Sequence, residues 1–217
     1  MQQLVYPAMQ CNDIRFLGAD VCQLGLDQRK VNMLARDQAG AMGLARPPVI
    51  LSHPMMPGLK EGQAKMSNLK SHPDTAIFME DSREDVARKI AKAHCPPGVE
   101  EGNPCLVYLK CIVFPFAVKA GRPVVITDER TGVVAAAYDT YRALADAYVG
   151  GSVHPKDLKA CLVAELNGLL EPTRRHFATN PAAARLLAQV QELTKAPSSG
   201  GPTTAGDAGA GASAGSA

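Results

Sequence analysis

Apolar and polar positions divide the chain into a short α/β part, a longer helical part and a polar tail. Residues 17–24 form an apolar segment that ends at Gly25, which predicts a buried strand of a parallel sheet. Residues 47–52 form a second, β-branched run, followed by a loop rich in proline and glycine. From residue 83 onward the apolar spacing becomes helical, which predicts a second, all-α part.

The helical part is predicted to be a bundle of four or five helices with one small hairpin. An apolar helix over residues 103–114 opens with Pro104, and residues 123–127 with the turn-like DERTG indicate the hairpin. Proline at first-turn positions starts two later helices, and Pro172 is expected to kink the first of them. The faces expected to be buried are Val86 and Ile90; Tyr138, Tyr141, Leu144, Ala145 and Tyr148; Leu158, Leu162, Leu166 and Leu169; and, after the capping Asn180 and Pro181, Leu186, Leu187, Val190 and Leu193.

These patterns divide the chain into an α/β segment at residues 1–82, a helical domain at 83–195 and a tail at 196–217. The tail consists almost entirely of Gly, Ala, Ser, Thr and Pro. A segment of that composition cannot bury enough apolar surface to fold, so we expect it to be disordered.

Composition indicates the cellular compartment and the state of the cysteines but does not indicate a function. The 217 residues are 46% apolar with a net charge of +2, and no run approaches the length of a membrane span. The N-terminus has neither a basic region nor an apolar stretch typical of a leader, so we expect a cytoplasmic protein without a membrane partner. Six scattered cysteines lack a CxxC pair, which argues against zinc and favours reduced thiols.

Candidate chemistry begins near the N-terminus. Tyr6, Gln10 and Asp13 are spaced i, i+4 and i+7, so a helix would place them on one face, where they could bind a small polar ligand. Gly25 is followed by Asp27 and Gln28, and ligands of open α/β sheets bind at the carboxyl ends of strands. The alternative is a solvated helix face with water as its only partner.

Three sequence motifs carry a family resemblance. YPAMQCND at residues 6–13, GLDQRK at 25–30 and KMS at 65–67 occur in an order that resembles the class I tyrosyl-tRNA synthetases of the archaeal and eukaryotic type. Farther along, GNPCLVYLKCIVFP, SVHPKDLK and LLEPTRRHF are similar to the same family. The resemblance implies the second half of a Rossmann-like catalytic domain, followed by a helical anticodon-binding domain.

The resemblance also assigns roles to individual residues. Tyr6, Gln10 and Gln28 would bind the amino group of tyrosine, and Asp13 would accept a hydrogen bond from its phenol. The ATP site would include Gly25, Asp27, Lys65 and Ser67, and the catalytic lysines would be Lys65 and Lys70. Mg²⁺ is expected to accompany ATP, with no tightly bound metal of the protein itself.

The lysine loop departs from the family pattern. Relatives would read KMSKSDP, whereas residues 65–78 read KMSNLKSHPDTAIF, which we interpret as a two-residue insertion of Asn68 and Leu69. Such an insertion displaces Lys70 by up to roughly 7 Å in an extended loop, enough to miss a phosphate. Lys65 and Lys70 as ordinary exposed loop lysines remain the alternative.

The family's HIGH-like phosphate motif and the tyrosine that completes the phenol clamp have no counterpart. Either another polypeptide supplies that half or the sequence is a truncated version of a longer one, and we favour truncation. Members of the family are homodimers, and much of their dimer surface lies near the part without a counterpart.

In the helical domain, the resemblance makes Asp157 an acceptor for the first anticodon base. The family's stacking aromatic aligns with Thr131. Candidate phosphate contacts are Lys156, Lys159, Arg174 and Arg175. A first-turn dipole partner is the alternative role for Asp157, and it needs no RNA.

The leading hypothesis is therefore a tyrosine–tRNA ligase acting on tyrosine, ATP and tRNA-Tyr. Two alternatives remain: a non-catalytic relative that binds tRNA or protein, and a helical interaction domain without an RNA role.

Overall fold

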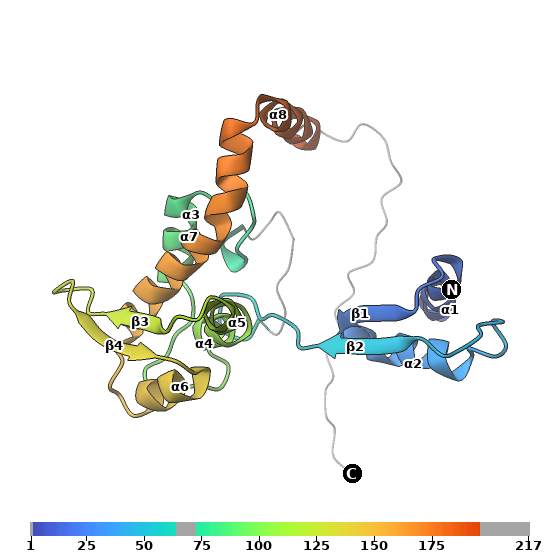
Figure 1. The fold of residues 1–217 in the computed structure, drawn as a ribbon, viewed down its shortest axis with the longest axis horizontal. Coiled ribbons are helices and arrows are strands. Elements are labelled where there is room, and N and C mark those ends of the chain that lie inside the picture. The colour runs from blue at the N-terminus through green and yellow to red at the C-terminus, as the bar shows by residue number, and fades with distance from the viewer. Residues whose placement is uncertain (1, 64–72, 196–217) are drawn as a thin grey trace, which may run out of the picture. The chain divides into compact units, whose positions relative to one another are not determined.

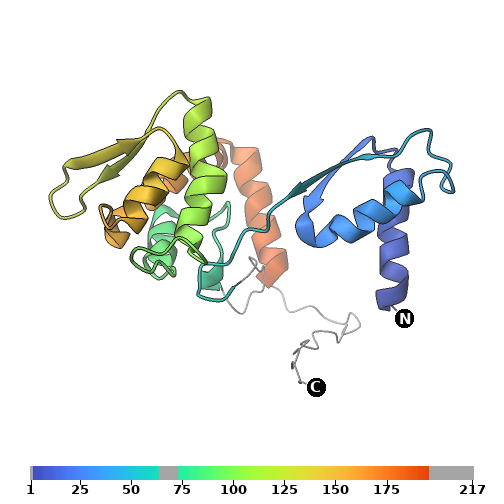
Figure 2. The same ribbon diagram turned by 90° about the horizontal axis from the view of Figure 1, so that it is seen from below.

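The computed structural model describes residues 2–63 and 73–195 (Figures 1 and 2). The chain divides into two compact units, Met1–Glu171 and Pro172–Ala217. The elements are α1 (Gln2–Phe16), β1 (Val21–Gly25), the 3₁₀ turn η1 (Leu26–Gln28), α2 (Arg29–Asp37), β2 (Val49–His53), the 3₁₀ turn η2 (Pro73–Thr75), α3 (Arg83–Ala91), α4 (Pro104–Tyr108), the π-helical turn η3 (Leu109–Val113), α5 (Phe114–Lys119), β3 (Val124–Thr127), β4 (Val134–Tyr138), α6 (Tyr141–Val149), α7 (Pro155–Thr179) and α8 (Pro181–Lys195).

The N-terminal part of the first unit is a small α/β layer. β1 and β2 pair in parallel, with Val21 opposite Val49 and Gly25 opposite His53, which confirms the predicted parallel arrangement. The core beneath them is formed by Cys11 and Ile14 of α1 against Ala35 of α2. Figure 1 shows α2 beside the strand pair.

The prediction of a buried strand over residues 17–24 is wrong. The strand begins at Val21, and Leu17 lies exposed before it. Val21, Val49 and Leu51 are each about half exposed on one face of the pair. A parallel strand is buried only when both faces of its sheet are covered, and in the described residues only two strands pair here.

The helical part shares one large core. Val86 and Ile90 of α3 are fully buried in it, as predicted, and Leu144, Tyr148, Leu158 and Leu162 contribute from α6 and α7. A capping box starts α3: the Ser82 hydroxyl accepts the N–H of Asp85 at 3.0 Å, and the Asp85 carboxylate accepts the N–H of Ser82 at 3.3 Å.

The segment after β2 also packs into the helical core. Leu59 is fully buried there, and its carbonyl accepts the N–H of His94 at 2.7 Å. The buried Tyr108 hydroxyl donates to the carbonyl of Pro57 at 3.2 Å. The boundary predicted between residues 82 and 83 stays a prediction, since the division into compact units falls at Pro172.

The apolar helix predicted over residues 103–114 extends farther than expected. Asn103 is its N-cap, and helical turns continue from Pro104 through Lys119 with a π turn at Leu109–Val113. Pro115 has no N–H to donate to the carbonyl one turn earlier, and the wider turn immediately before it avoids the clash of a regular α-helix.

The hairpin and the aromatic helix agree with expectation, except at one residue. β3 and β4 pair antiparallel, with Val124 opposite Tyr138. Tyr138 therefore ends a strand rather than beginning the helix, which starts at Tyr141. Tyr148 is fully buried, in keeping with a core role.

The buried faces of α7 and α8 differ from the predicted ones. In α7 the fourth buried leucine is Leu170 rather than Leu169, which is half-buried. In α8 the predicted inward face is wrong at three of its four residues: Leu186 is 60% and Leu193 76% exposed, and Val190 is exposed as well, whereas Leu187 is half-buried. Within the described part of the second unit, the end of α7 is the only other helix beside α8 in the sequence.

α7 continues through Pro172 as one helix, so the predicted kink stays a prediction. In the described part of the chain, every helix is too short or too polar to cross a lipid bilayer.

Candidate functional site

The predicted ligand-binding face lies on a helix, as the spacing required. Tyr6, Gln10 and Asp13 all belong to α1, next to the face that buries Cys11 and Ile14. Tyr6 is 57% exposed and Asp13 is exposed, whereas Gln10 is half-buried. The Gln10 Oε1 atom is buried without a hydrogen-bond partner among the described residues. A buried, unpaired amide oxygen is unfavourable unless a donor binds to it.

The second part of the predicted site lies at the carboxyl end of β1. Gly25 is the last residue of the strand, and a Cβ atom there would lie 2.6 Å from Met55 Sδ and 2.7 Å from Asp27 Oδ1. Glycine therefore allows the chain to turn closely at the strand end. Gln28 Nε2 donates to Asp27 Oδ2 at 3.2 Å, so these two side chains lie together.

The structure does not link the two parts directly. Among the described residues, no hydrogen bond joins Tyr6, Gln10 or Asp13 to Asp27 or Gln28. Their convergence around one ligand stays a prediction. Lys65, Ser67 and Lys70 lie outside the described residues, as do Asn68 and Leu69.

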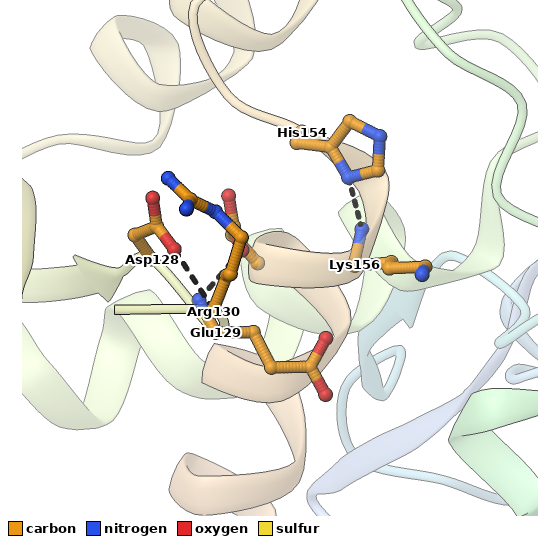
Figure 3. Close-up of a pocket in the computed structure, with 6 residues that line it drawn as sticks. Asp128, Glu129, Arg130, His154 and Lys156 are labelled. Atoms are coloured by element: carbon orange, nitrogen blue, oxygen red, sulfur yellow. Dashed lines mark hydrogen bonds between the residues drawn. The ribbon is translucent and has the colours of Figure 1, made fainter. Parts of the chain in front are cut away.

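A second candidate site lies where the β3–β4 hairpin meets the start of α7. A cavity of about 610 Å³ is lined by Asp128, Glu129, Arg130, His154, Lys156 and Asp157 (Figure 3). Asp157 Oδ1 accepts the backbone N–H of Glu129 at 2.9 Å. This bond holds the first turn of α7 against the hairpin loop, so Asp157 has a structural partner beyond the helix dipole.

Hydrogen bonds within the loop fix its shape. The Asp128 carboxylate accepts the N–H groups of Thr131 at 2.9 Å and Arg130 at 2.8 Å, and Gly132 has a positive φ of 71°. These backbone donors, that of Thr131 first, hold the pKa of Asp128 below its usual value. The loop thus keeps a negative charge beside the exposed Arg130.

His154 caps the helix that follows. Its Nδ1 accepts the N–H of Lys156 at 3.2 Å (Figure 3). Its carbonyl accepts the N–H of Leu158 at 3.0 Å. A ring that accepts at Nδ1 presents a donor at Nε2. The sequence patterns predicted roles for Lys156 and Asp157 but not for His154 or for Asp128, Glu129 and Arg130. A histidine directly before Pro155, at the start of a predicted helix, was the available signal for a cap at His154.

A neighbouring hollow of about 620 Å³ extends along α3 and α7, lined by Ala87, Ala91, Glu129, Lys156, Lys159, Ala160 and Val163. Lys159, predicted as a phosphate contact, donates to the carbonyl of Ala91 at 2.8 Å. Lys156 lines both cavities and is exposed, so it remains available to an anion.

Comparisons with known proteins identify the family. A model of the tRNA synthetases class I (W and Y) matches residues 1–171. The chain is 49% identical over 189 residues to "Tyrosine--tRNA ligase 2, cytoplasmic" of Arabidopsis thaliana, covering 87% of this chain and 24% of that protein. It is 48% identical over 191 residues to "Tyrosine--tRNA ligase 1, cytoplasmic" of the same plant, covering 87% of this chain and 48% of that protein.

Structural similarity agrees. The tyrosyl-tRNA synthetase of Leishmania major in complex with tyrosinol superposes with a TM-score of 0.77 at 48% identity, covering 90% of this chain and 30% of that one. The chain thus spans between a quarter and a half of the length of the two plant relatives. With the family model matching well over half of its residues, the chain belongs to the class I tRNA synthetases of the tryptophan and tyrosine type.

Proposed function

We propose that this chain acts in a tyrosine–tRNA ligase. It contributes residues that bind tyrosine and tRNA-Tyr. The observation that carries the proposal is the helix face of Tyr6, Gln10 and Asp13, in a chain 48–49% identical to tyrosine–tRNA ligases. Asp27 and Gln28, which follow the end of a parallel strand, support it, because ligands of such sheets bind there.

Each proposed tyrosine contact has a chemical reason. The ammonium group of tyrosine supplies the donor that Gln10 Oε1 lacks, with Tyr6 and Gln28 beside it. The Asp13 carboxylate accepts the phenol O–H. Phenylalanine would leave that acceptor unpaired, which is how a site built for a hydroxyl rejects its analogue.

The proposed reaction has two steps. The tyrosine carboxylate attacks the α-phosphate of ATP, which is bound as its Mg²⁺ complex, and forms tyrosyl-adenylate with release of pyrophosphate. A ribose hydroxyl of tRNA then attacks the tyrosyl carbonyl and AMP leaves. Asp27 is assigned to the ribose, with Gly25 and Ser67 at the ATP site, and Lys65 and Lys70 neutralise charge that develops on the pyrophosphate.

The helical part is proposed to bind the anticodon stem and loop. The cavity lined by Asp128, Glu129, Arg130, His154, Lys156 and Asp157 offers cations for phosphates and carboxylate acceptors for the N–H edge of a base. One carboxylate oxygen of Asp157 accepts the N–H of Glu129, and we assign the second oxygen as the acceptor for RNA. Cytoplasmic location is part of the same proposal.

A second function, a non-catalytic tRNA-binding module, is favoured by two departures from the family pattern. Asn68 and Leu69 interrupt the lysine motif, and Thr131 stands where the family has a stacking aromatic.

Two measurements on the full chain separate these functions. Tyrosine-dependent exchange of labelled pyrophosphate into ATP, absent with phenylalanine or tryptophan, would support the ligase. Salt-dependent binding of tRNA-Tyr, with no exchange even after the half with the HIGH-like motif is supplied, would support the module, because phosphate contacts weaken with salt. If the chain shows no pyrophosphate exchange and also no binding of tRNA-Tyr, both proposed functions are wrong. Deleting Asn68 and Leu69 in a chain to which the half with the HIGH-like motif has been restored should raise exchange if the insertion displaces Lys70.

A further inference from the structure

The two parallel strands of the α/β part end in residues that lie side by side. The last residue of β1 is Gly25, the last residue of β2 is His53, and the two are partners in the register of the pair. Such partners direct their side chains to the same face of a sheet, and neighbouring strands lie about 4.8 Å apart. His53 is exposed. Its imidazole therefore lies at the edge where ligands of open α/β sheets bind.

The face that Gly25 and His53 share is the one opposite α1 and α2. Cys22 packs against the small core formed by these helices, and Gly25 follows Cys22 by three positions. Because successive residues of a strand alternate between faces, Gly25 belongs to the other face. Val21 and Val49, which are each about half exposed, precede Gly25 and His53 on that face.

The Asp27 carboxylate lies beside the same place. A Cβ atom on Gly25 would point to the face that His53 shares and would lie 2.7 Å from Asp27 Oδ1. The other oxygen, Asp27 Oδ2, accepts an N–H of Gln28 Nε2 at 3.2 Å. The Oδ1 atom is thus the carboxylate oxygen that can accept from a ligand. An imidazole and a carboxylate oxygen are neighbours on one face at the strand ends.

A hydrogen bond of the His53 ring determines its tautomer. Nδ1 lies 3.1 Å from the carbonyl oxygen of Pro54. A carbonyl oxygen can only accept, so Nδ1 carries the proton and donates, and Nε2 of the neutral ring is an acceptor. Two acceptors, Asp27 Oδ1 and His53 Nε2, therefore lie at this edge of the strand pair.

We propose that Asp27 and His53 together bind the two ribose hydroxyls of ATP. The 2′- and 3′-hydroxyls of a ribonucleotide are neighbouring O–H donors, so two neighbouring acceptors match them. Asp27 Oδ1 accepts from one hydroxyl and His53 Nε2 from the other. His53 is then a further binding residue, and it makes the site selective for ribonucleotides over deoxyribonucleotides. This inference rests on the proposed function, which assigns Asp27 to the ribose.

The test measures how the full chain binds ATP with Mg²⁺ and its 2′-deoxy and 3′-deoxy forms, by ligand-observed NMR titration. The wild-type chain should bind ATP more tightly than either deoxy form. His53→Ala should bind ATP about two- to tenfold more weakly, which corresponds to the loss of one neutral hydrogen bond. For the deoxy form that lacks the hydroxyl contacted by His53, wild type and His53→Ala should have equal affinities. Asp27→Ala should show that equality for the other deoxy form.

Two further variants and one further ligand separate a ribose contact from other roles of His53. Glutamine has an amide oxygen that can reach the position of Nε2, so His53→Gln should restore most of the ATP affinity. His176→Ala removes an exposed histidine of α7 and should leave all affinities unchanged. Adenosine has no phosphate, and it should show the same ratio of wild-type to His53→Ala affinity as ATP does.

The possible outcomes distinguish this inference from the proposed function. Equal ATP affinities of wild type and His53→Ala, or an equal loss for ATP and both deoxy forms, would overturn the role of His53 and leave the proposed function in place. A wild-type chain that binds none of these nucleotides would contradict the ATP site of the proposed function, and the ribose contact with it.

Discussion

The carboxylate of Asp157 accepts the backbone N–H of Glu129 at 2.9 Å, and this bond ties the first turn of α7 to the β3–β4 hairpin. The two residues are separated by almost thirty positions in the chain. Asp157 therefore has two assigned tasks, which are to hold the hairpin loop and, under the proposed function, to accept a hydrogen bond from an anticodon base.

Two substitutions of Asp157 separate these tasks. Asp157→Asn keeps an oxygen for the Glu129 N–H but replaces the charged acceptor by a neutral amide. A hydrogen bond to a charged group contributes about 1.5–3 kcal/mol, so tRNA-Tyr affinity should fall roughly ten- to hundredfold with little change in stability. Filter binding at fixed salt measures the affinity for tRNA-Tyr, and urea unfolding measures the stability.

Asp157→Ala should lower both quantities. The Glu129 N–H loses its acceptor, at a cost of about 1 kcal/mol in unfolding free energy, and RNA loses the same contact. Equal tRNA affinity for wild type and both variants would leave Asp157 with its structural task only.

A second prediction concerns the buried ion pair of α3. Lys89 Nζ lies 2.8 and 2.6 Å from the two carboxylate oxygens of Asp81, with only 3% of the lysine side chain exposed. It also lies 4.6 Å above the ring of Phe78. Lys89→Met would remove the Lys89 ammonium group from the buried Asp81 carboxylate, at a cost of about 3–5 kcal/mol in unfolding free energy.

The matched control for that substitution is Lys92→Met. Lys92 pairs with Asp74 at 3.0 Å but is 60% exposed, so its loss should cost less than about 1 kcal/mol. Equal effects of the two substitutions in urea unfolding would show that burial does not distinguish these pairs.

Local patterns were sufficient to predict much of this fold. The spacing of Val86 and Ile90 predicts one apolar helix face, and both are buried because the large helical core covers that face. The face of Leu186 and Leu193 has the same periodicity, yet both are exposed. Periodicity identifies an apolar face but not the element that covers it, and that depends on tertiary packing.

In the candidate sites, too, local sequence patterns predicted some features, and others depend on tertiary packing. Tyr6, Gln10 and Asp13 could be placed on one helix face from their spacing. The bond from Glu129 to Asp157 could not be foreseen, because it depends on the register of the hairpin and on where α7 begins.

A third prediction is an acid-sensitive step in stability. Hydrogen bonds from Arg88 and then Lys92 lower the pKa of Asp74 to about 2, and those from Ser82 and then Arg88 do the same for Asp85. A lowered folded-state pKa stabilises the fold above the unfolded value, and this stabilisation disappears as pH falls through the folded value. The unfolding free energy should therefore decrease from about pH 4 to about pH 2.

Urea midpoints across that range test the assignment. Asp74→Asn should flatten the decrease. Asp37→Asn should leave it unchanged, since the Asp37 side chain is exposed at the end of α2 and its carboxylate makes no hydrogen bond among the described residues. Identical pH profiles for wild type and Asp74→Asn would remove Asp74 from the explanation.

The last prediction is a gain of binding at the hairpin loop. Thr131 is exposed, and its N–H is bound to Asp128 at 2.9 Å, whereas its hydroxyl accepts only a long bond of 3.4 Å from the N–H of Val133. Enlarging the side chain therefore keeps the main hydrogen bond of the turn. Under the proposed function it stands where a base-stacking aromatic belongs. Stacking on a base contributes about 1–3 kcal/mol, so Thr131→Tyr should raise tRNA-Tyr affinity roughly ten- to hundredfold. Thr131→Leu, which adds apolar bulk without a ring face, should gain little. Equal gains for leucine and tyrosine would point to simple burial, and no gain for either would place the anticodon elsewhere.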